Sequence, residues 1–450
     1  MQSIKKIPET LWTHKKKSVA AGVTIVLLGR YLRNRQRDNN IRAAYARLAV
    51  EYGQQTISPE RKPRRVTVLA NVFADEHRVY EKFKLNALPL LNLAGMEVDI
   101  IRAEDEAQLE SVAAALDKAE ADALYIVGGD GTVSKALSGI YRNRTEPALP
   151  IGIFPGGCEN RGLRTLVPHV FGDCNNVGRY CESAMALIEE NARKVHVVKC
   201  ELDDPKEEKN ASDAVKPVFG LSDFNAGWFH HVELKKKKFW YWGGLKRRFA
   251  YFWEIMKHSP EPMHLKVIYE EYCQGCKKCR TMSVTPQPQW RWWHALIGSP
   301  RYAVKENSER DYSKIENKNC GERHSLDIIA TDLLIDKDQF EDSSALRLRA
   351  GGSQLSRLKA VLEGWSRCSA KQIEVSPNKE FYEHNIEARA VSLSFKILPE
   401  LLKKFSIFGE LIEIEGDYDS KLVRMEVLPR PIDLYLPSGI RIDQNEANPF

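Results

Sequence analysis

Residues 66 to 154 alternate between short apolar runs and longer segments with helical spacing. The apolar runs have the length of buried strands and are Val66–Ala70, Val98–Ile101, Ala123–Val127 and Ile151–Phe154. Between them, within Asp75–Leu93, Leu109–Leu116 and Val133–Tyr141, apolar residues recur every three or four positions. This alternation predicts an α/β domain over residues 66–195, with an open, mostly parallel sheet covered by helices.

Beyond residue 195 the pattern becomes strand-like. The segments Lys194–Leu202, His264–Tyr269, Ser325–Leu334 and Ala390–Ile397 predict strands, whereas long helical stretches are few. The polar stretches 203–216 and 300–322 are predicted to be loops or insertions. We therefore expect a second, β-rich domain over residues 196–440, followed by a tail at 441–450.

The first 52 residues form a distinct segment. An apolar run, Val19–Leu28, lies between two clusters of lysines and arginines and is shorter than the roughly 20 residues of a spanning helix. Basic flanks and few acidic residues favour a short mitochondrial membrane anchor over residues 1–52. A non-mitochondrial interfacial anchor and an ordinary N-terminal helix are the alternatives. Residues 53–65, which contain glycine and prolines, are predicted to be a linker.

Composition excludes some classes of protein and leaves the partner open. A chain of 450 residues with 43% apolar residues can bury a large core and is not a disordered scaffold. The 67 basic residues nearly balance the 61 acidic ones, so the net charge of +6 indicates little. Nine cysteines, an odd number in a long chain, predict mostly free thiols.

The segment Gly128-Gly129-Asp130-Gly131-Thr132 lies between a predicted buried strand and a predicted helix. Backbone amides and a helix N-terminus converge on an anion at such a junction, and glycines let a phosphate approach the backbone. The carboxylate of Asp130 suits a phosphate-bound Mg²⁺, and the hydroxyl of Thr132 lies near the helix cap. A plain glycine turn is the alternative. The segment has neither the P-loop nor the dinucleotide-binding spacing.

These residues resemble the diacylglycerol kinase-like catalytic domain shared by diacylglycerol, sphingosine, ceramide and acylglycerol kinases. The likeness continues at Pro155–Asn160, where Cys158 replaces the family's threonine, and at Asn71, which Val72 follows in place of the family's proline. The resemblance implies a site for ATP and Mg²⁺, with Asp130 catalytic and close to the metal. The residues implied to bind the nucleotide are Asn71, Gly128, Gly129, Asp130, Gly131, Thr132, Gly157 and Asn160.

A second motif of the family lies near the C-terminus. Glu415-Gly416-Asp417 resembles the family's Asp-Gly-Glu turn, with the two acidic residues exchanged. The resemblance implies that Asp417 orients the lipid hydroxyl as a catalytic residue and that Glu415 contributes to the metal site. The alternative is that both are only turn residues between two strands.

Within the family, the mitochondrial acylglycerol kinase branch is most similar, at Leu93–Val98, Phe239–Lys246 and Val423–Arg430. This resemblance implies phosphorylation of monoacylglycerol and diacylglycerol to lysophosphatidate and phosphatidate. It also implies residence on the mitochondrial inner membrane facing the intermembrane space, and association with that membrane's carrier translocase. A translocase subunit that needs no catalysis, an NAD kinase, and a sphingosine or ceramide kinase are the alternatives.

Residues 235–253 interleave cations with aromatic side chains. Anionic lipid surfaces favour this mixture, because aromatic rings settle at the headgroups while lysine and arginine meet phosphates. Core packing and nucleic-acid binding are the alternatives, and we expect no nucleic acid as a partner. The residues predicted to dock on lipid are Lys235, Lys236, Phe239, Trp240, Trp242, Lys246, Arg247, Arg248 and Trp253.

Two further clusters bear groups that bind metals. Cys273, Cys276 and Cys279 offer three thiolates to zinc, but no fourth ligand is evident, so we interpret the run as a loop with free thiols. His230 and His231 follow a segment that resembles one bordering the family's lipid pocket. We predict that they are solvated or satisfied within the core.

Overall fold

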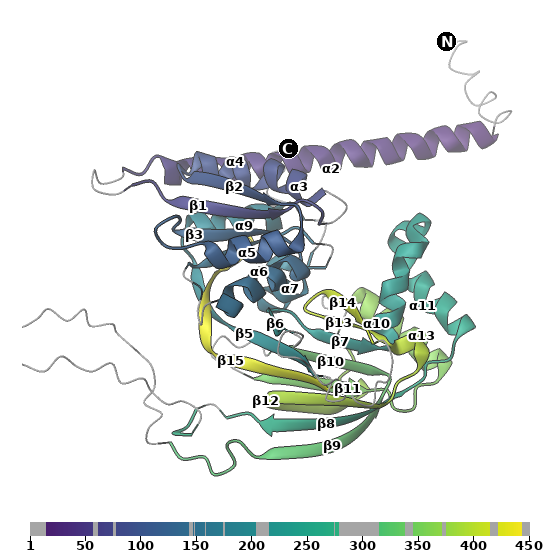
Figure 1. Cartoon of the computed structure of the whole chain (residues 1–450). Helices are drawn as coiled ribbons and strands as arrows, with labels where there is room; N and C mark the ends of the chain where they lie inside the picture. Colours follow the sequence, from purple (N-terminus) through teal and green to yellow (C-terminus); the bar gives the residue numbers. More distant parts are fainter. Residues whose placement is uncertain are drawn as a thin grey trace, which may run out of the picture. The chain divides into compact units, whose positions relative to one another are not determined.

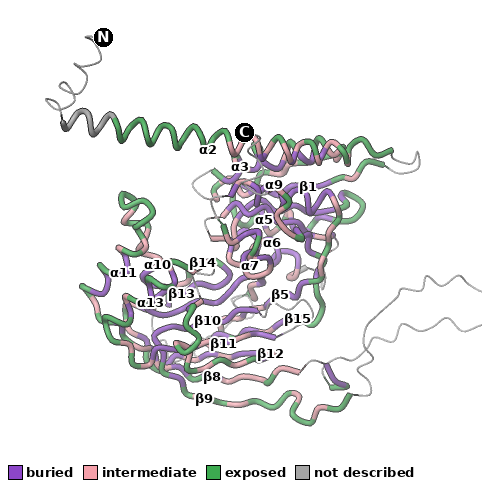
Figure 2. The backbone as a smooth tube through the Cα atoms, turned by 180° about the vertical axis from the view of Figure 1, so that it is seen from behind, coloured by how far each residue is buried: buried purple, intermediate pink, exposed green. Residues whose placement is uncertain are grey.

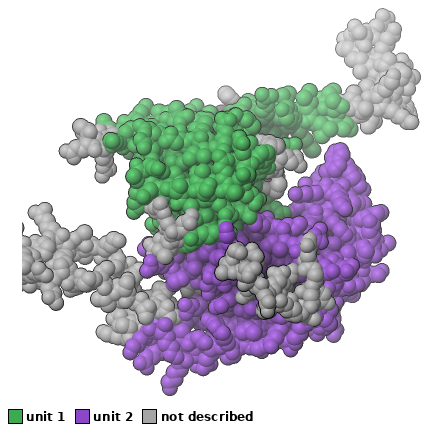
Figure 3. Space-filling view, viewed as in Figure 1, with its two compact units in different colours: residues 1–193, 432–450 green, residues 194–431 purple. Residues whose placement is uncertain are grey.

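The computed structural model describes residues 15–56, 62–74, 78–143, 147, 149–157, 159–173, 176–203, 216–273, 275–278, 315–337, 345–370, 375–414 and 422–442. The chain divides into two compact units, one of residues 1–193 with 432–450 and one of residues 194–431 (Figure 3). The first boundary lies close to the predicted one. The structure assigns the segment after residue 431 to the first unit, whereas we predicted that the second domain would run on to residue 440.

A parallel sheet forms the centre of the first unit, as predicted (Figure 1). Its strands are β2 (Glu97–Ala103), β1 (Arg65–Asn71), β3 (Ala123–Gly128) and β4 (Ile151–Pro155), hydrogen-bonded in that order. The C-terminal end of β15 (Leu422–Tyr435) adds a parallel neighbour to β4, with Leu434 opposite Ile151. All residues of β3 and β4 are buried, which explains their continuous apolar sequence.

Helices pack against this sheet and against one another. They are α3 (Arg78–Asn86), α4 (Leu88–Leu93), α5 (Glu106–Ala115), α6 (Asp130–Asn143), α7 (Arg161–Leu166), α8 (Pro168–Phe171) and α9 (Gly178–Ile188). We predicted helical structure throughout the segment 75–93. In the structure, α3 ends at Asn86 and a second helix, α4, begins at Leu88 with a proline in its first turn. Phe83 of α3 packs edge-on against Tyr125 and Phe154 of the sheet.

The N-terminal helix is much longer than the apolar run Val19–Leu28 within the predicted anchor segment. It is α2 (Lys15–Gly53), 39 residues long, and residues 22–36 of it are exposed (Figure 2). Further along, Ile41, Tyr45 and Ala49 recur at every fourth position and are buried in the core of the first unit. The helix therefore runs up to the start of the predicted linker at residue 53, and its last turns belong to the folded unit.

Within the described part of the chain, no helix has both the length and the apolar character that crossing a membrane requires.

The second unit is built on antiparallel strands, which confirms its predicted β-rich character. One ladder runs β14 (Glu410–Glu413), β13 (Lys404–Ile407), β7 (Phe224–Gly227), β10 (Asp332–Lys337), β11 (Leu346–Gly351), β12 (Tyr382–Ile397) and β15. β12 also pairs with β8 (Met263–Glu271), which pairs with β9 (Arg323–Ala330), and β5 (Ala192–Asp203) pairs with β6 (Val218–Gly220). The predicted strand 325–334 is divided at Thr331 into β9 and β10.

Helical segments complete the second unit: α10 (Trp228–Lys235), the 3₁₀ segments η1 (Lys236–Leu245), η3 (Lys379–Phe381) and η4 (Glu400–Leu402), α11 (Lys246–Lys257) and α13 (Arg357–Ser369). Trp228 and Phe229 of α10 pack with Tyr251 of α11 in the core. Arg367 of α13 is buried, pairs with Asp332 at 2.7 Å and stacks over the ring of Phe229.

Candidate functional site

The glycine segment joins β3 directly to α6. Strand β3 ends at Gly128 and the helix begins at Asp130, so Gly129 alone makes the turn. The first N–H groups of any α-helix lack acceptors within the helix, and the dipole makes that end attractive to anions. Residues 129–132 therefore present backbone donors at the carboxyl end of a parallel strand, where α/β sheets bind phosphates.

A second glycine loop, which follows β4, lies directly against this turn. The N–H groups of Gly156 and Gly157 both donate to the carbonyl of Gly128, at 3.0 and 3.2 Å. A Cβ atom at Gly157 would lie 2.6 Å from the Cα of Gly129, and one at Gly129 would lie 3.1 Å from the Cα of Gly157. Two backbones are thus in contact with no side chain between them, which requires glycine on both.

Asn160 holds the second loop in shape. Its side-chain oxygen accepts from the N–H of Gly157 at 2.9 Å, and its amide donates to the carbonyls of Pro155 and Gly157 at 3.1 and 2.9 Å. The residue is buried and takes the left-handed conformation, with φ of 49°, which asparagine tolerates better than most residues. Both ends of its side-chain amide are therefore engaged by the loop itself.

Asn71 links the end of β1 to the glycine turn. Its amide donates to the hydroxyl of Thr132 at 3.1 Å, and its side-chain oxygen accepts from the N–H of Phe73 at 3.1 Å. The structure therefore connects the predicted residues from the ends of β1, β3 and β4 in one hydrogen-bonded group. Val72, at the family's proline position, lies in the turn after β1.

Asp130 caps the N-terminus of α7, a contact that we did not predict from the sequence. Its two carboxylate oxygens accept from the N–H groups of Arg161 and Gly162, at 2.8 and 2.9 Å, at the start of α7. Burial raises the pKa of the Asp130 carboxyl, and these two backbone donors oppose that shift. Backbone donors are independent of side-chain type, so no sequence signal could have identified residues 161 and 162 as the partners.

The group fits phosphate and constrains how Mg²⁺ would bind. The contact between the Gly129 and Gly157 backbones keeps side chains out from between the two loops, and the donors of the α6 N-terminus suit a polyphosphate. Because each Asp130 oxygen already accepts one hydrogen bond, only its remaining lone pairs would be available to Mg²⁺, directly or through water. The other acidic candidates, Glu415 and Asp417, and the departure Cys158 lie outside the described residues.

The structure divides the predicted lipid-docking residues into two groups. Lys236 and Arg247 pair with Glu233 at 3.1 and 2.7 Å, and Lys235 pairs with the buried Glu254. These cations stabilise the unit internally, and Phe239 packs against its core, so core packing explains part of the pattern.

The other predicted docking residues lie at the surface. Trp240 is 77% exposed, Trp242 and Trp253 are 42% and 41% exposed, and Lys246 and Arg248 are exposed beside them in sequence. Tyr241, Leu245, Phe252 and Met256 add exposed apolar area from the same elements, η1 and α11. We call this set of exposed side chains the aromatic surface.

The two adjacent histidines are buried, as one of our predictions had it. His231 lies 3.4 Å from the carboxylate of Glu254, and burial together with Lys235 lowers its pKa. Both histidines are under 10% exposed on the buried helix α10, which places them in the core of the second unit.

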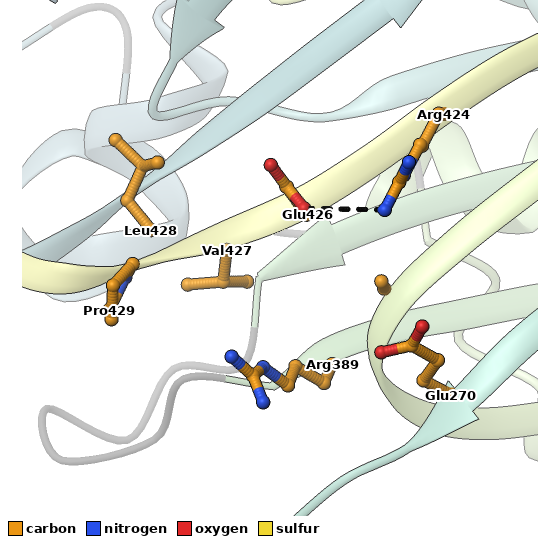
Figure 4. A pocket seen from close by; sticks show the side chains of 8 residues that line it. Glu270, Arg389, Arg424, Glu426, Val427, Leu428 and Pro429 are labelled. Atoms are coloured by element: carbon orange, nitrogen blue, oxygen red, sulfur yellow. Dashed lines mark ion pairs between the residues drawn. The ribbon is translucent and has the colours of Figure 1, made fainter. Parts of the chain in front are cut away.

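A hollow of about 270 Å³ lies in the second unit, and no predicted site residue lines it (Figure 4). It is lined by Glu270, Arg389, Ala390, Arg424, Glu426, Val427, Leu428 and Pro429, with Arg424 and Glu426 paired at 3.9 Å. Its charges balance one another, and its volume is below the range usual for ligand pockets.

Comparisons with known proteins bear on the first unit and on the whole chain. Residues 65–200 match the family described as "Diacylglycerol kinase catalytic domain". "Uncharacterized protein F52C9.3" of Caenorhabditis elegans is 38% identical over 98% of this chain and 98% of its own length.

The named relatives are more distant. "Acylglycerol kinase, mitochondrial" of Homo sapiens is 28% identical over 58% of this chain, and the match spans 59% of the human protein. The structure also aligns with a diacylglycerol kinase from Bacillus anthracis str. Sterne at a TM-score of 0.47, with 14% identity over 84% of this chain and 99% of that one.

Proposed function

Because this chain belongs to the diacylglycerol kinase catalytic-domain family of lipid kinases, we propose that it transfers the γ-phosphate of ATP to the hydroxyl of an acylglycerol. Monoacylglycerol and diacylglycerol are the proposed acceptors, and lysophosphatidate and phosphatidate the products. The similarity to proteins named mitochondrial acylglycerol kinase supports an acylglycerol as the acceptor.

The observation that carries the proposal is the contact between the Gly129 and Gly157 backbones beside the N-terminus of α6. No side chain lies between the two glycine backbones, and the first N–H groups of α6 begin beside them, an arrangement that suits a polyphosphate. Phosphoryl transfer depends mainly on positioning and charge neutralisation, so the protein's task is to hold the phosphates still.

Each residue of the group has a proposed part in this task. The N–H groups of residues 129–132 bind phosphate oxygens, and Asn71 orients the hydroxyl of Thr132 toward them. Mg²⁺ bound with ATP would neutralise phosphate charge. Asp130 would help to hold it, directly or through water, while its carboxylate keeps α7 in place. Asp417 is proposed to orient the acceptor hydroxyl, and Glu415 to assist at the metal.

The test is ATP-dependent phosphorylation in mixed micelles, with monoacylglycerol, diacylglycerol, sphingosine and ceramide as acceptors and NAD as a soluble control. Labelled lysophosphatidate and phosphatidate are expected from wild type, and less from Asp130→Asn and Asp417→Asn. Labelling of NAD alone would establish the NAD kinase alternative. Silence on every acceptor, with ATP binding intact, would instead favour the interaction subunit of a carrier translocase.

The aromatic surface is the proposed site of membrane contact. Its tryptophans suit the headgroup level of a bilayer, and Lys246 and Arg248 suit anionic lipid phosphates. We propose the mitochondrial inner membrane, on its intermembrane-space side, as the location. The similarity to a mitochondrial acylglycerol kinase supports the mitochondrion as the organelle. Immunogold labelling and protease protection in isolated mitochondria test the compartment.

A further inference from the structure

Three cysteines that are separated in the sequence meet at one end of a hairpin in the second unit. The sulfur atoms of Cys273, Cys276 and Cys320 all lie within 4.8 Å of one another. From the sequence we had grouped only the cysteines of the run at 273–279. Cys320 lies 44 positions after Cys276 and was missed. Cys279 lies outside the described residues.

Strand register explains why Cys320 arrives at this place. In the β8–β9 ladder Glu270 lies opposite Arg323, and the antiparallel register continues without a shift through all of the pairs. Extending this antiparallel register by three residues beyond both strands places Cys273 opposite Cys320. The ladder thus brings two of the three thiols together, and the short loop from residue 273 to 276 brings the third.

One hydrogen bond to sulfur and several contacts of the loop backbone hold the cysteines in place. The amide of Asn317 donates to the sulfur of Cys273 at 3.4 Å, which stabilises negative charge on sulfur. Gly275 has φ of +142° between the two cysteines of the loop, a conformation that a residue with a Cβ rarely adopts. The N–H of Lys277 donates to the carbonyl of Ile315 at 3.1 Å, and Lys278 donates to the carbonyl of Lys318 at 3.3 Å.

We propose that Cys273, Cys276 and Cys320 bind one zinc ion. Thiolates about 3.8 Å apart are what tetrahedral zinc with Zn–S bonds of about 2.3 Å requires, and the three sulfurs are already within reach of that spacing. Each thiol releases its proton on binding, so three thiolates and Zn²⁺ carry one net negative charge, which Lys277 and Lys278 offset. Water completes the fourth position, because Cys273 and Cys320 are only half-buried.

The ion would act as a clip between the two ends of the chain that connects β8 to β9. It would join the loop after β8 to the turn before β9 and so close residues 277–319 into a loop. Metal binding of this kind contributes directly to folding free energy. The inference rests on the hairpin alone and is independent of the proposed kinase activity.

The test uses the full-length protein purified under reducing conditions. Elemental analysis should find about one zinc per chain, and exchange for Co²⁺ should give a near-ultraviolet thiolate-to-cobalt band whose intensity corresponds to three thiolates. Cys273→Ser and Cys320→Ser should lose both signals. Cys368→Ser, which changes a partly buried thiol elsewhere in the same unit, should keep them.

Alkylation of the wild type gives a second readout that does not depend on whether the variants fold. Removing zinc with a chelator should raise the alkylation rates of Cys273, Cys276 and Cys320 together, and leave that of Cys368 unchanged. Wild type that binds neither zinc nor cobalt, or a cobalt band that survives in Cys320→Ser, would overturn the proposal. So would a Cys273–Cys320 disulfide in protein that binds no metal after reduction.

Discussion

At the scale of single residues, Asp130 serves both as the predicted catalytic carboxylate and as the cap of α7. In Asp130→Asn, an NH₂ group replaces one of the two carboxylate oxygens. This group is a donor and cannot accept a hydrogen bond, so one of the two backbone N–H groups at the start of α7 loses its partner. We expect a loss of about 1–3 kcal/mol in the free energy of unfolding, together with a loss of kinase turnover of about 100-fold or more. Denaturant unfolding and lipid phosphorylation measure the two effects.

A matched change separates these two effects. Asp105 caps α5 by accepting from the N–H of Gln108 at 2.6 Å and is no part of the glycine group. Asp105→Asn or Asp105→Ala should cost up to about 1 kcal/mol of stability and keep the turnover. If the Asp130 and Asp105 variants lost the same stability and also the same turnover, Asp130 would act only through the fold.

The close approach of Gly129 and Gly157 gives a second prediction at this scale. In Gly157→Ala the new methyl group would lie 2.6 Å from Gly129 and 2.9 Å from the Asn160 side-chain oxygen, so the two loops must separate. We expect about 1–3 kcal/mol of destabilisation and at least a tenfold weaker binding of an ATP analogue. Gly439→Ala, where nothing lies within 4 Å of the new methyl group, is the control and should change neither.

How far the sequence predicted this site depends on the kind of contact. The resemblance to the family implied that Asn71, the 128–132 segment, Gly157 and Asn160 belong to one site. The structure explains why they can meet, because the parallel strands that precede them bring their carboxyl ends to one edge of the sheet. The bonds from Arg161 and Gly162 to Asp130 were not predictable, because backbone donors leave no mark in the sequence. Cys320 was missed for a similar reason, since its position depends on strand register.

At the scale of elements, α2 has two parts with different roles. Residues 22–36 are exposed, whereas Tyr45 is buried and donates to Glu182 at 2.6 Å. Deleting residues 1–34 should change the free energy of unfolding by less than about 0.5 kcal/mol and reduce membrane association. Tyr45→Ala should cost about 3–5 kcal/mol, and Tyr45→Phe about 1–3 kcal/mol.

Thermal and denaturant unfolding of these three variants measure the stabilities, and flotation with vesicles measures the association. A deletion that destabilises the protein as much as Tyr45→Ala would contradict the division of the helix. The four-residue spacing of Ile41, Tyr45 and Ala49 is present in the sequence. We interpreted the whole segment as an anchor because of the apolar run that precedes them.

The aromatic surface allows another prediction for η1 and α11. Replacing Trp240 and Trp242 together by alanine should weaken binding to anionic vesicles by about tenfold or more with little change in stability, because both side chains are largely exposed. Lys246→Ala should weaken it less, by about 1 kcal/mol, in a salt-dependent way.

Leu358→Ala and Leu362→Ala on α13 provide the comparison, since these leucines are also exposed and were not predicted to touch lipid. Vesicle co-sedimentation at two salt concentrations measures all of the variants. Equal losses in the α13 variants would show that any exposed apolar side chain suffices, and would remove the assignment of the aromatic surface.

At the scale of the whole molecule, the first unit is built from two separated parts of the chain. Leu434 pairs beside β4, the N–H of Leu436 donates to the carbonyl of Asn191 at 3.0 Å, and Arg441 pairs with Glu189. A chain that ends at residue 431 should therefore lose protection of the first unit against proteolysis and bind an ATP analogue more weakly. A chain that ends at 442 should retain both.

Limited proteolysis followed by mass spectrometry, with cleavage mapped to residues 65–193, measures this protection. Equal protection in the chains ending at 431 and 442 would show that the returning segment is dispensable. Sequence patterns predicted both units from their periodicity, but not the return of residues 432–442, because a strand's partner depends on contacts far along the chain.

This return also affects the order of folding during synthesis. The ribosome makes residues 194–431 before it makes the strand that lies beside β4, so the first unit cannot be completed until that returning segment has emerged. Until then the open edge of β4 would be exposed to chaperones or to aggregation. A nonsense codon shortly before residue 432 would thus damage the unit encoded first in the message.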